Sequence, residues 1–404
     1  MNVSREAMPA SVAEVADALR AATADSHRVT VAGGGTHLAF GRSNEPPDVV
    51  LRTTALNRVV EYVPHDMTIA VEAGMTIADL SSLLARHRCR LPLDVEDPRT
   101  STIGGVIAFG IAGPRRLGMG TLRDYLIGAR IALADGTLVK TGGMVVKNVS
   151  GYDLTRMLHG SMGSLGVMTS LNFKLAPMPA EQSTVPFDFG DASLALATAA
   201  ALLASRLPFA ALQADSSGTL RVGCDGHAAD AARLRAGARN AALVRGGTEG
   251  DTLEGERAVA EAWRASAAAP FGGRTVTLRV TSTPSRVAGD VERTVRAAGR
   301  LDREARWTAD AGCSTIELSM ETSSGTEGAE GAEEVARLER LIDALADLSP
   351  SVRVTRCPLE MRPGLALFGR APSSARILRL VKSQFDPQRV LAGDAFAAAG
   401  VTHG

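Results

Sequence analysis

The stretch VAGGGTHLAFG, residues 31–41, decides how the rest of the chain is interpreted. A short run typical of a β-strand, residues 28–31, leads directly into Gly33, Gly34 and Gly35. Consecutive glycines after a strand can point backbone N–H groups at the oxygens of a diphosphate, because no Cβ blocks the approach. The hydroxyl of Thr36 adds another donor. The pattern predicts a nucleotide-binding loop, although a triple glycine also forms ordinary turns.

Two further glycine-rich segments favour ligand binding over turns. They read DPRTSTIGG over residues 97–105, continuing through AFGIAGPRRLGMG to Gly120, and GSMGSLGVMT over residues 160–169. Folding loses extra conformational entropy for each glycine that it orders, so three such loops in one region indicate a function. We predict that they hold a dinucleotide together, and that Gly34→Val blocks the diphosphate.

The common fingerprints of nucleotide-binding proteins are absent from the sequence. Gly118 and Gly120 begin a GxGxxG motif, but Arg123 occupies the position of its last glycine. The third segment has the spacing GxxGxxG instead, and no GxxxxGK[ST] motif occurs in the chain. The loops therefore fit neither a nicotinamide-binding Rossmann domain nor a P-loop ATPase.

Short helices and strands are predicted around these loops in the first 178 residues. Thr76 suits an N-cap, and Ile77, Leu80 and Leu84 follow it at helical spacing. The Asp135-Gly136 dipeptide predicts a hairpin. The helices are expected over residues 11–21 and 76–87, and the strands over residues 28–31, 68–72, 126–133 and 138–139.

The middle of the chain differs in composition, because alanine-rich helices alternate there with short strands. Helices are expected over residues 192–205, 228–240, 284–298 and 333–348, and strands over residues 209–213, 219–223, 275–280 and 314–318. This mixture predicts a separate α+β domain. The boundary is placed at residues 177–186, where prolines are expected to interrupt any regular element.

No internal repeat is visible. The acidic stretch ETSSGTEGAE, residues 321–330, is interpreted as a mobile surface loop, with a lid as the alternative.

The overall charge and the cysteines exclude several classes of protein. Lysines plus arginines and aspartates plus glutamates both number 44, which argues against a polyanionic partner such as nucleic acid. The four cysteines lie far apart, so we expect reduced thiols and neither a zinc site nor an iron–sulfur cluster. The first ten residues contain no apolar segment, and no uncharged apolar run is long enough to span a membrane. A cytoplasmic protein is therefore expected.

Four ordered segments together resemble a known flavoprotein superfamily. They are GGGTHLAFG (33–41), VVLRTTALNRVVEYVPHDMTIAVEAGMTIADL (49–80), TSTIGGVIAFGIAGPRRLGMGTLRDYLIGARIALADGTLV (100–139) and VKNVSGYDLTRMLHGSMGSLGVMTSLNFKL (146–175). This combination resembles the vanillyl-alcohol oxidase / p-cresol methylhydroxylase superfamily. VKNVSGYDL leans towards the FAD-binding E subunits of bacterial glycolate oxidase. The resemblance covers residues 29–177.

The resemblance implies a fold, a domain plan and a cofactor site. The fold class would be α+β: a two-subdomain PCMH-type FAD-binding domain (1–178), a smaller ferredoxin-like cap domain for substrate or partner (179–350), and a C-terminal segment (351–404) packing back on the FAD domain. The implied contacts run from the diphosphate through the ribityl chain and flavin to the adenosine. They are Gly33, Gly34, Gly35, Thr36, His37, Thr100, Ser101, Thr102, Ile103, Gly104, Gly105, Gly113, Arg115, Arg116, Gly163, Gly166, Val167 and Met168.

Two positions depart from the pattern of the family. Some relatives attach the flavin covalently to a histidine in the first loop, but here Thr36 stands near that place and His37 follows it. We therefore expect non-covalent FAD, with a covalent bond to His37 as the alternative. Near the C-terminus, Phe385-Asp386-Pro387 keeps the family signature, whereas residues 391–394 read LAGD in place of asparagine-proline-glycine.

The sequence names candidates for catalysis without choosing among them. Oxidation of a 2-hydroxy acid needs a cation for the carboxylate, a base for the hydroxyl proton and a flavin that receives the hydride. No candidate has a neighbour that singles it out, so the catalytic residues stay unknown. The candidate cations are Arg115, Arg116, Arg356, Arg362 and Arg370, and the candidate bases are His37, His65, His159 and His227. No His-x-His cluster occurs, so no catalytic metal is expected.

Two functions remain open at this stage. In the first, the chain is the FAD-binding subunit of a complex that oxidises glycolate, or a similar acid such as D-lactate, to the 2-oxo acid. Electrons would then pass to an iron–sulfur subunit, beside a second flavoprotein subunit, and the complex could associate peripherally with a membrane. In the second, the chain is a non-catalytic FAD-binding or electron-relay module that supports a partner flavoprotein. A stand-alone oxidase using oxygen ranks last.

Overall fold

The computed structural model describes residues 5–37, 47–145, 153–267, 275–301, 304–322, 328–349, 351–370 and 372–391. VKNVSGYDL, the end of the first glycine segment and residues 323–327 of the acidic stretch lie wholly or largely outside these ranges. The chain forms two compact units. Unit 1 comprises Met1–Ala112, Thr121–Met178 and Ser373–Gly404, and unit 2 comprises Gly113–Gly120 and Pro179–Pro372.

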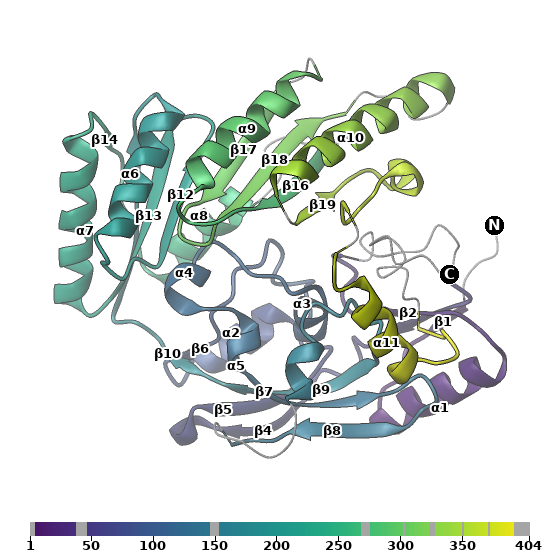
Figure 1. Ribbon diagram of the computed structural model, residues 1–404. Coiled ribbons are helices and arrows are strands. Elements are labelled where there is room, and N and C mark those ends of the chain that lie inside the picture. The colour runs from purple at the N-terminus through teal and green to yellow at the C-terminus, as the bar shows by residue number, and fades with distance from the viewer. Residues whose placement is uncertain are drawn as a thin grey trace. The chain divides into compact units, whose positions relative to one another are not determined.

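Unit 1 contains a parallel three-stranded sheet and an antiparallel five-stranded sheet, and a two-stranded pair completes it (Figure 1). The sheet orders are β1-β3-β2, β4-β5-β9-β7-β8 and β10-β6. Two sheets in one unit agree with the expected two-subdomain FAD-binding fold. The strands are β1 (Arg5–Ala7), β2 (Val29–Ala32), β3 (Val49–Arg52), β4 (Val59–Val63), β5 (Thr68–Glu72), β6 (Cys89–Arg90), β7 (Leu126–Ala132), β8 (Leu138–Gly142), β9 (Val167–Lys174) and β10 (Ala176–Pro177).

Side-chain caps fix where the helices of unit 1 begin. Ser11 accepts a hydrogen bond from the Glu14 amide and donates to its carboxylate, which starts α1. Thr76 caps α2 through the Asp79 amide, as the sequence predicts. The helices are α1 (Val12–Ala24), α2 (Ile77–Ala85), α3 (Ile103–Phe109), α5 (Leu122–Tyr125) and α11 (Ala375–Phe385), with 3₁₀ turns η1 (Pro64–Asp66) and η2 (Leu154–Met157).

Unit 2 is a nine-stranded sheet with helices α6, α7, α9 and α10 packed on one face (Figure 1). Trp263 of α8 packs with Ala211 in a separate small cluster. Unit 2 is as large as unit 1, so the cap is not the smaller domain that was expected. The elements are α4 (Arg116–Met119), β11 (Glu181–Asp188), α6 (Ala192–Ala204), β12 (Ala211–Asp215), β13 (Thr219–Gly226), α7 (Ala228–Leu243), β14 (Thr248–Glu249), β15 (Leu253–Glu254), α8 (Glu256–Ala267), β16 (Thr275–Thr281), α9 (Val287–Gly299), β17 (Ala305–Asp310), β18 (Thr315–Glu321), α10 (Gly328–Leu348), β19 (Val352–Arg356) and η3 (Leu359–Gly364).

The sheet of unit 2 is built from two ferredoxin-like βαββαβ modules. The first runs β11-α6-β12-β13-α7-β14 and the second runs β16-α9-β17-β18-α10-β19. The sheet order is β14-β11-β13-β12-β17-β18-β16-β19. The strands of the second module therefore lie in the reverse order of the corresponding strands of the first. The modules join where Gln213 of β12 pairs with Asp310 of β17. The ferredoxin-like prediction is therefore confirmed, and the structure contains a repeat that is not visible in the sequence.

Two sequence predictions hold only in part near element ends. Residues 178–180 separate β10 from β11, and the chain passes from unit 1 to unit 2 at Met178 and Pro179, within the predicted boundary. The predicted interruption does not extend to Pro186, because β11 runs through that residue. Its outer edge pairs with β14 at Phe187 and Asp188 and with β15 at Ser183 and Thr184, so Pro186 lies between those short pairings and needs no N–H. The acidic stretch was predicted to be a loop, but α10 already begins at Gly328.

Candidate functional site

The first glycine loop presents three backbone donors that have no partner among the residues described by the structure. β2 ends at Ala32, and Gly33, Gly34 and Gly35 follow, with Gly35 at φ +82°. Their amide N–H groups donate no hydrogen bond to any residue that the structure describes. Backbone donors in folded proteins are almost always satisfied, so three successive unsatisfied amides indicate water or an anionic ligand.

The side of Gly33 and Gly34 that a Cβ would occupy is filled by the second glycine segment. A Cβ on Gly33 would lie 2.0 Å from Oγ1 of Thr102, and a Cβ on Gly34 would lie 1.6 Å from the carbonyl oxygen of Thr100. These two glycines are therefore required for loop-to-loop packing as well as for access to their amides. Gly34→Val would disrupt that packing, so it does not test ligand binding by itself.

The second segment forms the start of α3 beneath the first loop. Thr102 caps this helix by accepting a hydrogen bond from the Gly105 amide at 3.3 Å. Gly104 packs against Ala73 of the loop after β5, where a Cβ would come within 2.8 Å. Gly105 is less confined, since its Cβ would meet only Oγ1 of Thr102, at 3.2 Å. The segment thus orders the first loop and leaves Gly105 facing the cleft described next.

The third segment is anchored to the other end of α3. The amides of Gly160 and Met162 donate to the carbonyls of Ile107 and Ala108 at 2.9 and 2.8 Å. Met162 and Gly163 both have positive φ, at 53° and 76°, so the chain reverses sharply there. Because both neighbouring loops contact α3, this short helix holds the three glycine segments around one space.

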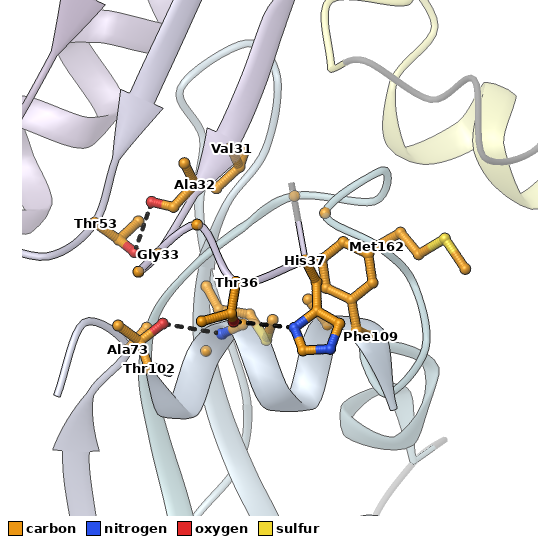
Figure 2. Close-up of a pocket in the computed structure, with 18 residues that line it drawn as sticks. Val31, Ala32, Gly33, Thr36, His37, Thr53, Ala73, Thr102, Phe109 and Met162 are labelled. Carbon is orange, nitrogen blue, oxygen red and sulfur yellow. Dashed lines mark hydrogen bonds between the residues drawn. The ribbon is translucent and has the colours of Figure 1, made fainter. Parts of the chain in front are cut away.

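That space is a cleft within unit 1 of about 580 Å³, including its open mouth. Figure 2 shows the glycine loop on one side and the rings of His37 and Phe109 with Met162 on the other. The rings lie 5.4 Å apart, and the Nδ1 atom of His37 lies 3.0 Å from the Thr36 hydroxyl. The cleft therefore combines main-chain donors with an apolar wall.

The structure brings most of the predicted cofactor residues into this cleft. The lining residues among them are Gly33, Gly34, Gly35, Thr36, His37, Thr102, Gly104, Gly105, Gly163, Gly166 and Met168. Four others support the lining residues. Thr100 packs on Gly34, and Ser101 lies 3.4 Å from the Thr36 hydroxyl. Ile103 and Val167 are buried in the core of unit 1.

The remaining three predicted residues belong to unit 2. The short segment Gly113–Gly120 packs there. Nη1 of Arg115 donates to Oε1 of Gln182 at 3.2 Å. Nη2 of Arg116 lies 3.5 Å from a carboxylate oxygen of Asp310 and donates to the Thr315 hydroxyl at 2.5 Å. Burial raises the pKa of Asp310, and the charge of Arg116 opposes that rise. Contacts of Gly113, Arg115 and Arg116 with the cofactor stay a prediction.

Sequence reasoning missed the apolar half of the cleft. The residues that it did not name are Val31, Ala32, Thr53, Ala73, Ala108, Phe109 and Met162. Most are small or apolar side chains, which look like ordinary core residues in a sequence. Phe109 and Met162 had one usable signal, since each lies within two residues of a glycine at a predicted loop.

The candidate bases lie in different surroundings. His37 lines the cleft, whereas His65 and His227 are exposed on η1 and before α7. His159 packs against Gly110, and its Nε2 atom is buried without a hydrogen-bond partner in the described chain. Burial, reinforced by the charge of Arg123, lowers the pKa of His159. The structure brings none of these histidines into contact with another candidate base.

The other candidate cations and the cysteines are not among the residues that line the cleft. Arg370 pairs with Asp347 at 2.6 Å, Arg362 is buried in η3, and Arg356 ends β19. Burial raises the pKa of Cys224 to about 12 and those of Cys313 and Cys357 to about 11. In the described part of the chain, no three His, Cys, Asp or Glu side chains are grouped so that they could hold a metal ion. No helix among the described residues is both long and apolar enough to cross a bilayer.

Comparison with known proteins identifies the N-terminal region. Residues 4–142 match the model of a family described as an FAD binding domain. The chain is 33% identical over 198 residues to glycolate oxidase subunit GlcD of Bacillus subtilis, covering 48% of this chain and 42% of that protein. It is 39% identical over 124 residues to glycolate oxidase subunit GlcE of Escherichia coli, covering 30% of this chain and 35% of that protein.

The same region is similar to other FAD-linked proteins. The D-lactate dehydrogenase of Archaeoglobus fulgidus is 34% identical over 182 residues, which cover 45% of this chain and 40% of that protein. Each of these matches spans less than half of the relative's length.

A solved structure extends the fold similarity to nearly the whole chain. A structure of alkyldihydroxyacetonephosphate synthase superposes with a TM-score of 0.71 at 14% identity, covering 96% of this chain and 75% of that one. The α+β fold and the resemblance to FAD-binding glycolate oxidase subunits are therefore confirmed. Residues 4–142 carry an FAD-binding domain of the matched family.

Proposed function

We propose that this chain is the FAD-binding subunit of a complex that oxidises glycolate, or a similar 2-hydroxy acid such as D-lactate, to the 2-oxo acid. The single observation that carries the proposal is the row of unpartnered amides at Gly33, Gly34 and Gly35 beside the cleft. The relatives named glycolate oxidase subunits and D-lactate dehydrogenase support the substrate class.

The residues of the cleft suit a dinucleotide held without a covalent bond. The three glycine amides would donate to the diphosphate, where the nearby Thr36 hydroxyl adds a donor. Phe109, Met162 and Met168 would pack against a ring of the cofactor. FAD supplies the acceptor for the hydride of the substrate. His37 lies against Phe109 and Thr36, and we propose that it orients the cofactor rather than bonding to it.

A role as an electron-relay module is the second candidate. Among the described residues that line the cleft, His37 alone carries an ionisable side chain. Oxidation of a hydroxy acid needs a base and a cation near the substrate, so this composition favours a chain that holds FAD while a partner flavoprotein performs hydride transfer. In both candidates, the electrons would leave through an iron–sulfur subunit of the complex.

We place the chain in the cytoplasm, with any attachment to the inner face of the membrane made through the complex. The partners would be a second flavoprotein and the iron–sulfur subunit, as the relatives named GlcD and GlcE suggest for a multi-subunit oxidase.

The experiment begins with the purified full-length chain. It is expected to be yellow, and acid should release intact FAD, which tests the cofactor and the non-covalent bond together. A colourless preparation that takes up no added FAD contradicts the proposal. Glycolate or D-lactate is then added without oxygen. Bleaching of the flavin absorbance supports the catalytic subunit, and unchanged absorbance supports the relay module.

A further inference from the structure

A buried ion pair links the C-terminal helix to the third glycine segment. Lys382 lies in the last turn of α11, and its side chain is 13% exposed. Its ammonium donates to the Asp386 carboxylate at 2.5 Å, to the Ser164 carbonyl at 2.8 Å and to the Leu391 carbonyl at 3.0 Å. An ammonium group carries three protons, so it can serve these three acceptors at once.

Asp386 attaches the following residues to the strand that leads into the first glycine loop. It is fully buried, and its two oxygens accept the amides of Val390 and Leu391 at 2.9 Å each. The Val390 carbonyl accepts the Val29 amide at 2.7 Å, and Leu391 bridges Val29 in parallel. Val29 begins β2, whose end is the Gly33 loop. The carboxylate therefore holds Val390 and Leu391 alongside β2.

Ser164 attaches the other end of the pair to the third segment. It is fully buried, and its hydroxyl donates to the Ser161 carbonyl at 2.6 Å. Met162, Gly163 and Gly166 on either side of it line the cleft. One ammonium group thus contacts the third segment directly and the first through Leu391 and Val29.

We propose that Lys382 and Asp386 are positioning residues that fix the first and third glycine segments relative to each other, and so set the affinity for the diphosphate part of the cofactor. Neither residue lines the cleft. They act through Ser164 and β2, each of which is next to residues that line the cleft. The inference rests on the proposed FAD site and adds a determinant that lies more than two hundred residues away in sequence.

The first test compares variants of the full-length chain. Lys382→Met keeps the length of the side chain and removes its charge, so we expect FAD and ADP to bind at least about tenfold more weakly. Lys382→Arg keeps the charge and donors and should recover most of the affinity. Ile69→Ala serves as the matched control, because it creates a cavity in the core of unit 1 away from the cleft. It should lower stability and leave the ADP affinity near that of the wild type.

A loss of ADP affinity that follows stability alone, equal in Lys382→Met and Ile69→Ala, overturns the proposal. So does a Lys382→Met protein that binds ADP normally. The wild type supplies a second measurement that needs no variant to fold. Coupling is reciprocal, so ADP must slow hydrogen exchange at the amides of Val390 and Leu391. Unchanged exchange there while ADP is bound refutes the proposal, whereas a wild type that binds neither FAD nor ADP refutes the FAD site itself.

Discussion

At the scale of the residue, Gly33 and Gly34 show that a bare backbone can serve two purposes at once. Their amides face a cleft, while their Cβ sides are filled by Thr102 and Thr100. The sequence argument considered only the approach of a ligand. Loop packing is an independent reason for glycine at both positions, and it changes which substitutions test the site.

A double-mutant cycle at Gly33 and Thr102 tests this packing. Gly33→Ala should destabilise the protein because the new Cβ overlaps Oγ1 of Thr102. Thr102→Ala should cost about 1 kcal/mol by removing the cap of α3. The double variant should be more stable than the sum of the two losses by about 1 kcal/mol, since the overlapping oxygen is gone. The free energy of unfolding in urea measures each term, and strict additivity would contradict the packing.

His159 predicts how stability responds to acid. Its pKa is lowered by burial from the usual 6.5, so the unfolded chain takes up a proton near that pH and the folded protein does not. Stability from this group is therefore complete above pH 6.5 and is lost as the pH falls below it. His159→Phe should lose less stability than the wild type does when the pH falls from above 6.5 to below it. The exposed His65→Phe is the control and should respond like the wild type. The urea midpoints of unfolding of all three proteins, measured above and below pH 6.5, test this prediction.

At the scale of the element, α3 organises the cleft. Its first turn carries Thr102, Gly104 and Gly105, and its carbonyls at Ile107 and Ala108 hold the third segment. A helix of this length stabilises itself poorly, so its position depends on those loops as much as theirs depends on it.

Gly105→Leu tests whether this face of α3 contacts the cofactor. A side chain here meets only the Thr102 hydroxyl and points into the cleft, so the protein should fold while FAD affinity falls at least about tenfold, or about 1.4 kcal/mol. Gly289→Leu in α9 is the matched control, since its Cβ would meet only an arginine side chain at 3.7 Å. Flavin fluorescence titrations should separate the two. Equal FAD affinity in both variants would remove Gly105 from the site.

Local patterns predicted most elements, because their signals lie within a few residues. The strand at 68–72 agrees with β5 at both ends, and the caps Ser11 and Thr76 start the expected helices. The glycine loops that line the cleft were likewise visible. The predicted boundary at 177–186 contains the passage between the units at Met178 and Pro179, but it extends too far, into β11. Pro186 is tolerated in that strand because of β14 and β15, more than sixty residues away in sequence. Phe109 and Met162 were not assigned, because a nearby glycine is their one signal and it does not say which way a side chain points.

At the scale of the whole molecule, the repeat in unit 2 could not be seen in the sequence. Two βαββαβ modules can share a topology with few identical residues, because each position requires only a side chain of suitable size and polarity. The modules meet at Ala214 and Ala309, both fully buried, where small residues allow β12 and β17 to pair.

The aromatic residues provide separate reporters for the two units. Both tryptophans, Trp263 and Trp307, belong to unit 2, and all three tyrosines lie within the first 178 residues. A chain that ends at Pro372 lacks α11, Val390 and Leu391, so we expect it to lose FAD binding and the tyrosine unfolding transition. The tryptophan transition should persist. Loss of both transitions together would show that unit 2 depends on the missing segment.

The chain path of unit 1 also sets the order of events during synthesis. The part of unit 1 that begins at Ser373 is synthesised after the whole of unit 2, and it contains Asp386 with its partners Val390 and Leu391. Domains usually fold as they emerge, the N-terminal one first. Here the nucleotide cleft, although encoded early, depends on residues that follow the whole of unit 2. Flavin loading should therefore begin only after Leu391 has been synthesised, and nascent chains stalled before that point should emerge without cofactor.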